Sequence, residues 1–318
     1  MRRAIAAVVL AAALLPGCSS PAKDGATDET KGEARKYVIG MSQCNLGEPW
    51  RQQMNKDIEA AAAKHPEVEM IFRDAQNKSE TQQSQMREFV QQKVDLIIIS
   101  PKESRPLVKP VSDAMAAGIP VIVLDRKLES DNFTCFIGAD NVKIGREAGK
   151  ELAKQLGGKG SIVELKGLMT SIPGHERHNG FMEGIKGTQI KTIFEADCGW
   201  LEPNAQREMK SALSRFEQID AVYGHNDPSA HGAYMAAKQE GKGRENTIKF
   251  VGIDALPDEG VRYVKKGILA LTFQYPTGGA EAIDTALKIL KGEKVDKTIT
   301  LGTRMFNKEN VEAGGVPL

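Results

Sequence analysis

Polar side chains of a few chemical kinds recur in this sequence at or soon after the ends of short apolar runs. The set combines carboxylates, guanidinium groups, carboxamides and two tryptophans, and its members are Asn45, Trp50, Asp125, Arg126, Arg177, Trp200, Asn226, Asp254 and Gln274. Carboxylates accept hydrogen bonds, guanidinium groups donate them and carboxamides do both, so together they can pair with many hydroxyl groups. An aromatic ring adds a surface for apolar C–H faces. These residue types predict a binding site for a small polyhydroxylated molecule.

Catalytic motifs would be the alternative explanation for such residues. The sequence has no Gly-x-Ser-x-Gly nucleophile elbow, no Walker phosphate loop and no Gly-x-Gly-x-x-Gly dinucleotide fingerprint. His175 and His178 are three residues apart without an indicated third metal ligand, and His225 beside Asp227 has no placed nucleophile. We therefore expect no catalysis, no metal and no other cofactor. An exported enzyme that modifies sugars is the alternative of a different class.

Strands that alternate with helices must position these side chains. Nearly continuous apolar runs predict nine strands, because parallel strands covered on both faces are hydrophobic throughout. The runs are Tyr37–Met41, Val68–Phe72, Leu96–Ile99, Val121–Leu124, Ile162–Leu165, Lys191–Glu195, Ala221–Tyr223, Ile248–Ile253 and Leu269–Phe273. Amphipathic helices are predicted between them, and Ser79 with Gln82 suggests a capping box at the start of one helix. Two parallel sheets of about five strands each are more economical than one, so we expect an α/β fold with two Rossmann-like lobes.

The alternation also predicts where the polar residues meet. Ligands of open parallel sheets bind beyond the carboxyl ends of the strands. Asp125, Asp254 and Gln274 each directly follow a predicted strand. Two alternatives remain open: Trp50 also fits the apolar face of a helix and so could be a core residue, and Asp125 with Arg126 could form a solvated ion pair in a turn.

The first 35 residues carry an export signal. Arg2 and Arg3 precede the apolar run Ala4–Leu15, which suits a signal peptide and is too short to span a bilayer. The Leu-Pro-Gly-Cys motif that ends at Cys18 is similar to a bacterial lipobox, although an incidental cysteine is the alternative. We expect a lipoprotein signal peptide with a lipidated cysteine over residues 1–18 and a disordered tether over residues 19–35. The folded part would then sit in the periplasm or at the cell surface, held to the membrane through the lipid.

Charge and cysteine content narrow the functional classes further. Lys and Arg number 43 against 42 Asp and Glu, a formal net charge of +1, so no excess of charge draws the protein toward nucleic acid. Cys44, Cys135 and Cys198 show no metal-site spacing, and their odd number leaves at least one unpaired. We expect buried free thiols, with a disulfide between two of them as the alternative.

Several motifs resemble the ribose/galactose-type periplasmic sugar-binding proteins, which form the type I periplasmic binding protein family. The motifs are Val123–Arg126, Phe136–Asn141, Glu176–Phe181, His225–Asp227 and Gly252–Asp254. Within that family, the chain is most similar to galactofuranose-binding proteins and to the fructose-sensing periplasmic regions of hybrid two-component kinases. Gln43-Cys44 followed by Trp50-Arg51, and the stretch Val251–Pro257, especially resemble the fructose-sensing regions.

The resemblance implies two lobes joined by three hinge crossovers, with the ligand enclosed between them. It assigns residues 36–138 plus 273–297 to the N-terminal lobe and residues 139–272 plus 298–318 to the C-terminal lobe. It also implies how the candidate residues act: hydrogen bonds from Asp125 and Arg126 in one lobe and from Arg177, Asn226 and Asp254 in the other, stacking on Trp200, and a bond from Gln274 near a crossover. The loop after the first strand carries Cys44, Asn45 and Trp50 instead of the paired aromatics of ribose binders, which argues against ribose itself.

The same resemblance implies a solute-binding lipoprotein that captures a monosaccharide, a pentose or hexose that can be in furanose form, by hinge closure. The partner would be an ABC permease, to which the monomeric binder delivers the sugar, or alternatively the ectodomain of a membrane sensor kinase. DNA-binding repressors of this fold are excluded, because no helix-turn-helix precedes Tyr37 and the chain carries an export signal.

Overall fold

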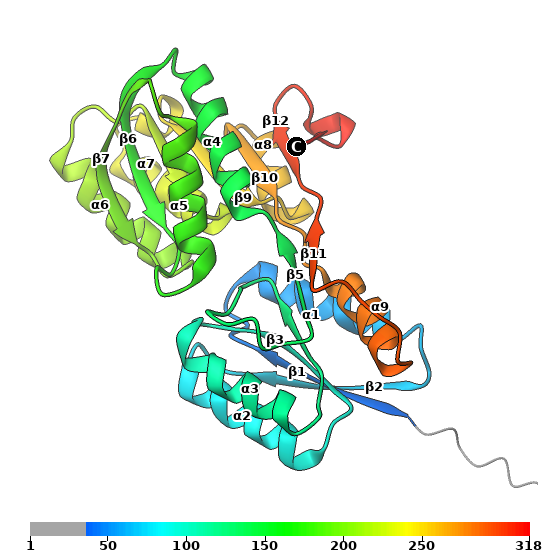
Figure 1. Ribbon diagram of the computed structural model, residues 1–318. Coiled ribbons are helices and arrows are strands. Elements are labelled where there is room, and N and C mark those ends of the chain that lie inside the picture. Colours follow the sequence, from blue (N-terminus) through cyan, green and yellow to red (C-terminus); the bar gives the residue numbers. More distant parts are fainter. Residues whose placement is uncertain (1–35) are drawn as a thin grey trace, which may run out of the picture. The chain divides into compact units, whose positions relative to one another are not determined.

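The computed structural model describes residues 36–318, which fold around two β-sheets (Figure 1). The predicted signal peptide, the tether and the lipidation site at Cys18 fall within residues 1–35 and so lie outside the described residues. In the described range, no helix combines the length and the apolar character that crossing a membrane requires. We refer to the six-stranded sheet with its helices as the first lobe and to the seven-stranded sheet with its helices as the second lobe.

The first lobe is a parallel sheet in the strand order β11-β5-β4-β3-β1-β2, with helices on both faces. Its strands are β1 (Tyr37–Gln43), β2 (Val68–Asp74), β3 (Leu96–Ser100), β4 (Val121–Leu124), β5 (Cys135–Ala139) and β11 (Thr298–Leu301). Its helices are α1 (Pro49–Ala62), α2 (Ser79–Gln92), η1 (Arg105–Leu107), α3 (Val108–Ala116) and α9 (Gly279–Leu290). In β3, Leu96 and Ile98 join the core cluster of α1 and α9, whereas Ile97 and Ile99 join that of α2 and α3. Both faces are therefore apolar, which explains the continuous hydrophobic run.

The second lobe has the strand order β13-β12-β10-β9-β8-β6-β7. Its parallel strands are β6 (Lys159–Lys166), β7 (Gln189–Asp197), β8 (Ala221–Gly224), β9 (Lys249–Asp254) and β10 (Leu271–Gln274). The antiparallel strands β12 (Arg304–Asn307) and β13 (Val316–Pro317) form one edge. The helices are α4 (Asn141–Gln155), α5 (Ile172–Gly184), α6 (Glu202–Arg215), α7 (Asp227–Glu240), η2 (Arg244–Asn246), η3 (Pro257–Val261), α8 (Arg262–Lys265) and η4 (Val311–Ala313).

Helices α4 and α5 touch backbone to backbone, and glycine makes this possible. A Cβ atom at Gly145 would lie 2.4 Å from the carbonyl oxygen of Arg177, and one at Gly180 would lie 2.1 Å from that of Val142. No other residue type fits without moving a helix. The contact fixes the position of α5, which carries Arg177.

The chain passes between the lobes three times: between β5 and α4, between β10 and α9 across residues 275–278, and between β11 and β12 across residues 302–303. The α/β class with two parallel-dominated sheets is confirmed. The lobe boundaries inferred from the sequence are wrong in three places. Ala139, assigned to the second lobe, is the last residue of β5 in the first sheet. Thr298–Leu301, assigned to the second lobe, pairs with β5 in the first sheet, and Phe273 with Gln274, assigned to the first lobe, belongs to β10 of the second sheet.

The predicted strands are all present, but the sheets hold six and seven strands because four strands escaped the sequence analysis. These are β5, β11, β12 and β13, which are only two to five residues long, and all four stand at or next to a sheet edge. The capping box is wrong as well. Ser79 is already inside α2 and donates to Glu103, while Gln82 donates to the carbonyl oxygens of Ser42 and Ser100. The expectation of buried free thiols is confirmed for Cys44, Cys135 and Cys198.

Candidate functional site

The ends of several strands from both lobes border one cavity. The residues that line it are Glu48, Trp50, Arg51, Asp125, Arg126, Pro173, Arg177, Trp200, Asn226, Asp254 and Tyr275. They come from α1 and the loop before it, from α5, and from the segments that follow β4, β7, β8, β9 and β10.

Seven of the nine candidate residues meet at this cavity, and two do not. Asn45 lies behind it, where its amide donates to Glu48 Oε1 at 2.8 Å and its Oδ1 accepts from the backbone N–H of Gly47 at 2.9 Å. Asn45 thus positions a lining residue. Gln274 instead borders a second opening beside the crossover at residues 275–278.

Four lining residues were missed by the sequence analysis: Glu48, Arg51, Pro173 and Tyr275. Tyr275 directly follows β10, which ends at Gln274 and not at Phe273 as predicted. With the correct strand end, the expectation that ligand residues follow the strands would have identified Tyr275. Arg51 was noted as part of a motif but given no role. Its position on the first turn of α1, which begins with Pro49 at the cavity, was the available signal.

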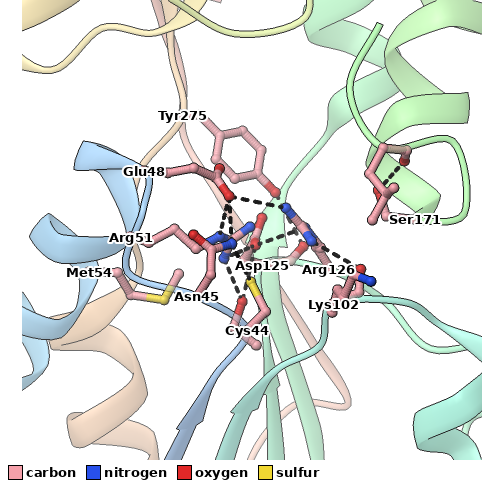
Figure 2. Close-up of polar contacts among 12 residues, drawn as sticks. Cys44, Asn45, Glu48, Arg51, Met54, Lys102, Asp125, Arg126, Ser171 and Tyr275 are labelled. Atoms are coloured by element: carbon pink, nitrogen blue, oxygen red, sulfur yellow. Dashed lines mark hydrogen bonds and ion pairs between the residues drawn. The ribbon is translucent and has the colours of Figure 1, made fainter. Parts of the chain in front are cut away.

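In the first lobe, an ionic cluster forms one wall of the cavity (Figure 2). Arg51 Nη1 donates to Asp125 Oδ2 at 2.9 Å and to Ser100 Oγ at 2.8 Å. Arg126 Nη1 donates to the carbonyl oxygen of Lys102 at 3.0 Å, and its Nε lies 3.8 Å from Asp125. Burial raises the pKa of Asp125, but the positive charges of Arg51 and Arg126 outweigh this and leave the pKa below its usual value. Asp125 is therefore an ionised acceptor with both charge and geometry fixed by the protein.

In the second lobe, Arg177 and Asp254 both line the cavity but differ in their hydrogen bonding to the protein. Arg177 Nε donates to Asn141 Oδ1 at 2.9 Å and Nη1 donates to the carbonyl oxygen of His225. Asp254 is 7% exposed, and no residue in the range 36–318 donates a hydrogen bond to its carboxyl group. Burial raises its pKa well above the usual value; Arg177 opposes the shift and Asp227 adds to it. A buried carboxyl group without a partner in the protein has capacity left for a ligand.

Trp200 packs against Gly167 and lies close to guanidinium groups from both lobes. The guanidinium carbons of Arg126 and Arg177 are 5.4 and 5.2 Å from the ring centroid, within the range of cation–π attraction. A Cβ atom at Gly167 would lie 2.2 Å from the indole, so only glycine leaves room for the ring. The indole N–H is buried and has no hydrogen-bond partner among the described residues.

Backbone strain concentrates at the same cavity. Asp125, Trp200 and Asp254 have positive φ angles of 72°, 70° and 129°, and few of the other described residues outside glycine do so. Such conformations cost about 1–3 kcal/mol each and persist where the surrounding structure enforces them, often at ligand sites. The three side chains are thus aimed by the backbone itself.

A second polar cluster, behind the cavity, has its groups paired with one another. Glu164 is fully buried and accepts from His178 Nδ1 and His225 Nε2, each at 2.9 Å. Burial raises the pKa of Glu164, but these two hydrogen bonds outweigh it and lower the pKa to about 2. Glu195 could complete a metal-sized group with Glu164 and His178, but Lys166 already forms an ion pair with it. This cluster supports the backbone that holds Arg177.

Comparison with known proteins supplies the family. The model of the periplasmic binding protein domain matches residues 39–294. A ribose import binding protein of Bacillus subtilis (strain 168) is 30% identical over 302 residues, which cover 94% of this chain and 97% of that protein. The solved fructose-binding periplasmic domain of a hybrid two-component system is similar with a TM-score of 0.84 and 42% identity, covering 87% of this chain and 93% of that one.

A solved galactofuranose-binding protein is similar with a TM-score of 0.83 and 26% identity, over 87% of this chain and 96% of that one. The resemblance drawn from the sequence motifs, including the two subgroups singled out there, is confirmed. With a family model spanning most of its length and two lobes that enclose one cavity, this chain belongs to the periplasmic binding protein family.

Proposed function

We propose that this protein is an extracytoplasmic lipoprotein that captures a monosaccharide between its lobes and delivers it to an ABC importer. The observation that carries the proposal is the unused hydrogen-bonding capacity of the shared cavity. Asp254 and the indole N–H of Trp200 are buried there without hydrogen-bond partners among residues 36–318, opposite the ionised Asp125. A ligand with several hydroxyl groups supplies both donors and acceptors for such a set.

The charges on the cavity wall favour a neutral ligand. Its wall carries three guanidinium groups, from Arg51, Arg126 and Arg177, and three carboxyl groups, from Glu48, Asp125 and Asp254. This balance supports a pentose or hexose over a sugar phosphate, because a phosphate would leave excess negative charge buried. Named relatives bind ribose, fructose and galactofuranose, which supports a monosaccharide, in furanose or pyranose form, as the class.

Hinge closure is the mechanism we propose for capture. The ligand contacts come from both lobes, so the sugar binds the closed arrangement more tightly than an open one and shifts the population toward it. The three crossovers are short, at one to four residues between the flanking elements, and serve as the hinge. Closure changes the outer faces of the lobes, and a membrane partner can read that change.

Export and anchoring also belong to this proposal. Residues 1–18 carry the basic, apolar and Cys18-ending pattern of a lipoprotein signal, and residues 19–35 would link the lipid to the folded lobes. Labelling with a fatty-acid analogue in a bacterial host, with Cys18→Ser as the matched control, tests it. Labelling of both forms, or of neither, would disprove lipidation at this residue.

A sugar receptor that presents its ligand to a membrane sensor kinase is the second candidate function. It is favoured by the fructose-binding periplasmic domain of a hybrid two-component system, which is 42% identical over most of this chain. Pull-down of the liganded protein with a solubilised ABC permease or with a kinase ectodomain encoded beside it distinguishes the two.

A thermal-shift screen tests ligand capture directly. Pentoses, hexoses, inositols and their phosphates are added in turn, and a sugar that binds the native state raises the melting temperature. We expect a neutral monosaccharide to give the largest shift and Arg177→Ala to remove it. If no sugar shifts the melting temperature, or if the sugar is recovered chemically changed, the proposed function is wrong.

A further inference from the structure

A contact between the lobes lies outside the cavity, at the loop that follows β4. Lys127, which immediately follows the cavity residue Arg126, places its Nζ 3.0 Å from Glu176 Oε1 on α5. The side chains of Lys127 and Glu176 are 42% and 20% exposed, so neither belongs to the cavity wall. Because the two residues are on different lobes, this ion pair can form only when the lobes are close together.

The other carboxylate oxygen of Glu176 contacts Asn141, a buried residue next to a crossover. Glu176 Oε2 accepts from Asn141 Nδ2 at 3.3 Å, and Asn141 Oδ1 accepts from Arg177 Nε at 2.9 Å. Asn141 is 2% exposed and is the first residue of α4, directly after the passage from the first lobe. Its Nδ2 also lies 3.4 Å from Tyr275 Oη, which belongs to the second passage between the lobes.

The chemistry of these groups fixes the direction of the chain of hydrogen bonds. A carboxylate can only accept and a guanidinium can only donate, so the carboxamide of Asn141 must turn its NH₂ toward Glu176 and its oxygen toward Arg177. The reversed amide would set two donors against each other at Arg177. The α4–α5 contact through Gly145 and Gly180 keeps Asn141 and Arg177 at bonding distance.

We propose that Lys127, Glu176 and Asn141 form a closure relay that orients Arg177 toward the ligand when the lobes meet, an inference that rests on the proposed sugar-binding function. The three are positioning residues. In the closed arrangement Lys127 holds the carboxylate of Glu176, the carboxylate holds the amide of Asn141, and the amide aims the guanidinium. When the lobes separate, Glu176 loses its cation from the first lobe and Arg177 loses the outer end of its support.

The simpler explanation is an ordinary surface ion pair with no link to the site, and variants can separate the two. Lys127→Met breaks the first step. Lys109→Met is the matched control, because Lys109 pairs with Asp113 at 2.7 Å within α3 and the same charge is lost inside one lobe. Lys127→Arg keeps the charge and tests rescue.

Three measurements on the purified chain decide the matter. The first is the closed fraction without ligand, from single-molecule energy transfer between dyes placed through unnatural amino acids at the exposed Glu80 and Lys210, one on each lobe. The second is the ¹⁵Nε–H resonance of Arg177, assigned by its absence in Arg177→Lys. The third is the dissociation rate of the sugar that gives the largest thermal shift, by stopped-flow tryptophan fluorescence.

We expect Lys127→Met to lower the closed fraction, to shift the Arg177 resonance and to raise the dissociation rate about two- to fivefold, the range for a partly exposed ion pair. Lys109→Met should change none of these, and Lys127→Arg should restore wild-type behaviour. If Lys127→Met matches Lys109→Met in all three, the relay is wrong. If Lys127→Met changes the closed fraction but leaves the Arg177 resonance in place, the pair is only a latch and the relay to Arg177 is wrong.

Failure of the proposed function gives a different pattern. If no sugar binds the wild type, the first two measurements still judge the relay, because neither needs a ligand. An unchanged closed fraction and resonance in Lys127→Met then overturn it independently.

Discussion

Replacing Asp254 by asparagine should weaken ligand binding strongly without destabilising the ligand-free protein. The Asp254 carboxyl group lines the cavity and receives no hydrogen bond from the residues that the structure describes. Asparagine has the same shape and tolerates the positive φ angle of 129° at this position. The substitution therefore changes what the cavity offers to a ligand and breaks no contact within the protein.

The size of the effect follows from the chemistry of the lost acceptor. Ligand hydroxyl groups that donate to Asp254 favour its ionised form, and a hydrogen bond to a charged group contributes about 1.5–3 kcal/mol. The affinity should therefore fall roughly 10- to 150-fold for each ligand hydroxyl that donates to Asp254.

The stability of the ligand-free protein should change in the opposite direction. Burial raises the pKa of Asp254 well above its usual value. A carboxyl group whose pKa is higher in the folded than in the unfolded state makes the protein less stable as the pH rises from the unfolded value, near 4, toward the folded one. Asp254→Asn should therefore match the wild type at about pH 4 and be the more stable of the two at neutral pH.

The assay is calorimetric titration with the bound sugar at neutral pH, together with urea unfolding of the ligand-free protein between pH 4 and 8. Asp125→Asn is the matched control, because it makes the same change at the other strained carboxylate. Asp125 accepts from Arg51 at 2.9 Å, so its neutralisation leaves Arg51 with the longer ion pair to Glu48, at 3.5 Å, and should lower the unfolding free energy by up to about 3–5 kcal/mol.

Two results would refute this reasoning. Sugar affinity within twofold of the wild type in Asp254→Asn would show that the carboxyl group does not contact the ligand. Equal loss of stability in Asp254→Asn and Asp125→Asn would show that both carboxylates stabilise the folded protein. Asp254 would then not be a group whose hydrogen-bonding capacity is free for a ligand.

Three further predictions concern the support of the site. Gly167→Ala should weaken sugar binding by about 1–3 kcal/mol, measured by calorimetry, because the new Cβ would displace the indole of Trp200. Gly180→Ala should lower the urea unfolding free energy by a similar amount, since α5 must then move away from α4; unchanged stability would mean that the two helices can separate freely. The hydrogen bond to Glu164 raises the pKa of His178, so this pair stabilises the protein below the unfolded pKa of about 6.5 and the contribution is lost as the pH rises through the folded value. His178→Gln should thus cost less than about 1 kcal/mol at pH 6 and still less at pH 9, and a larger cost at pH 9 than at pH 6 would contradict the ion pair.

The strands with two buried faces were predictable because burial on both faces requires apolar residues at successive positions within the strand itself. The run Leu96–Ile99 is apolar at successive positions since each face of β3 packs on helices. The edge strand β11 (Thr298–Leu301) carries no such signature, because its sequence must suit only one covered side. Its pairing with β5 is a long-range contact, and this is why the lobe boundary drawn from the sequence was wrong.

What the sequence by itself determined is the alternation of βα units and the residue types at the strand ends, since burial and hydrogen-bonding chemistry select these position by position. Only the tertiary structure decided which of those residues share a cavity. The structure places Gln274 outside the cavity and adds Arg51 and Tyr275 to its lining. Among the described residues, the carboxyl group of Asp254 has no hydrogen-bond donor, whereas that of Asp125 has two. The reason is physical: pairing across lobes depends on hinge geometry and on strained backbone angles, which arise from contacts between residues more than a hundred positions apart.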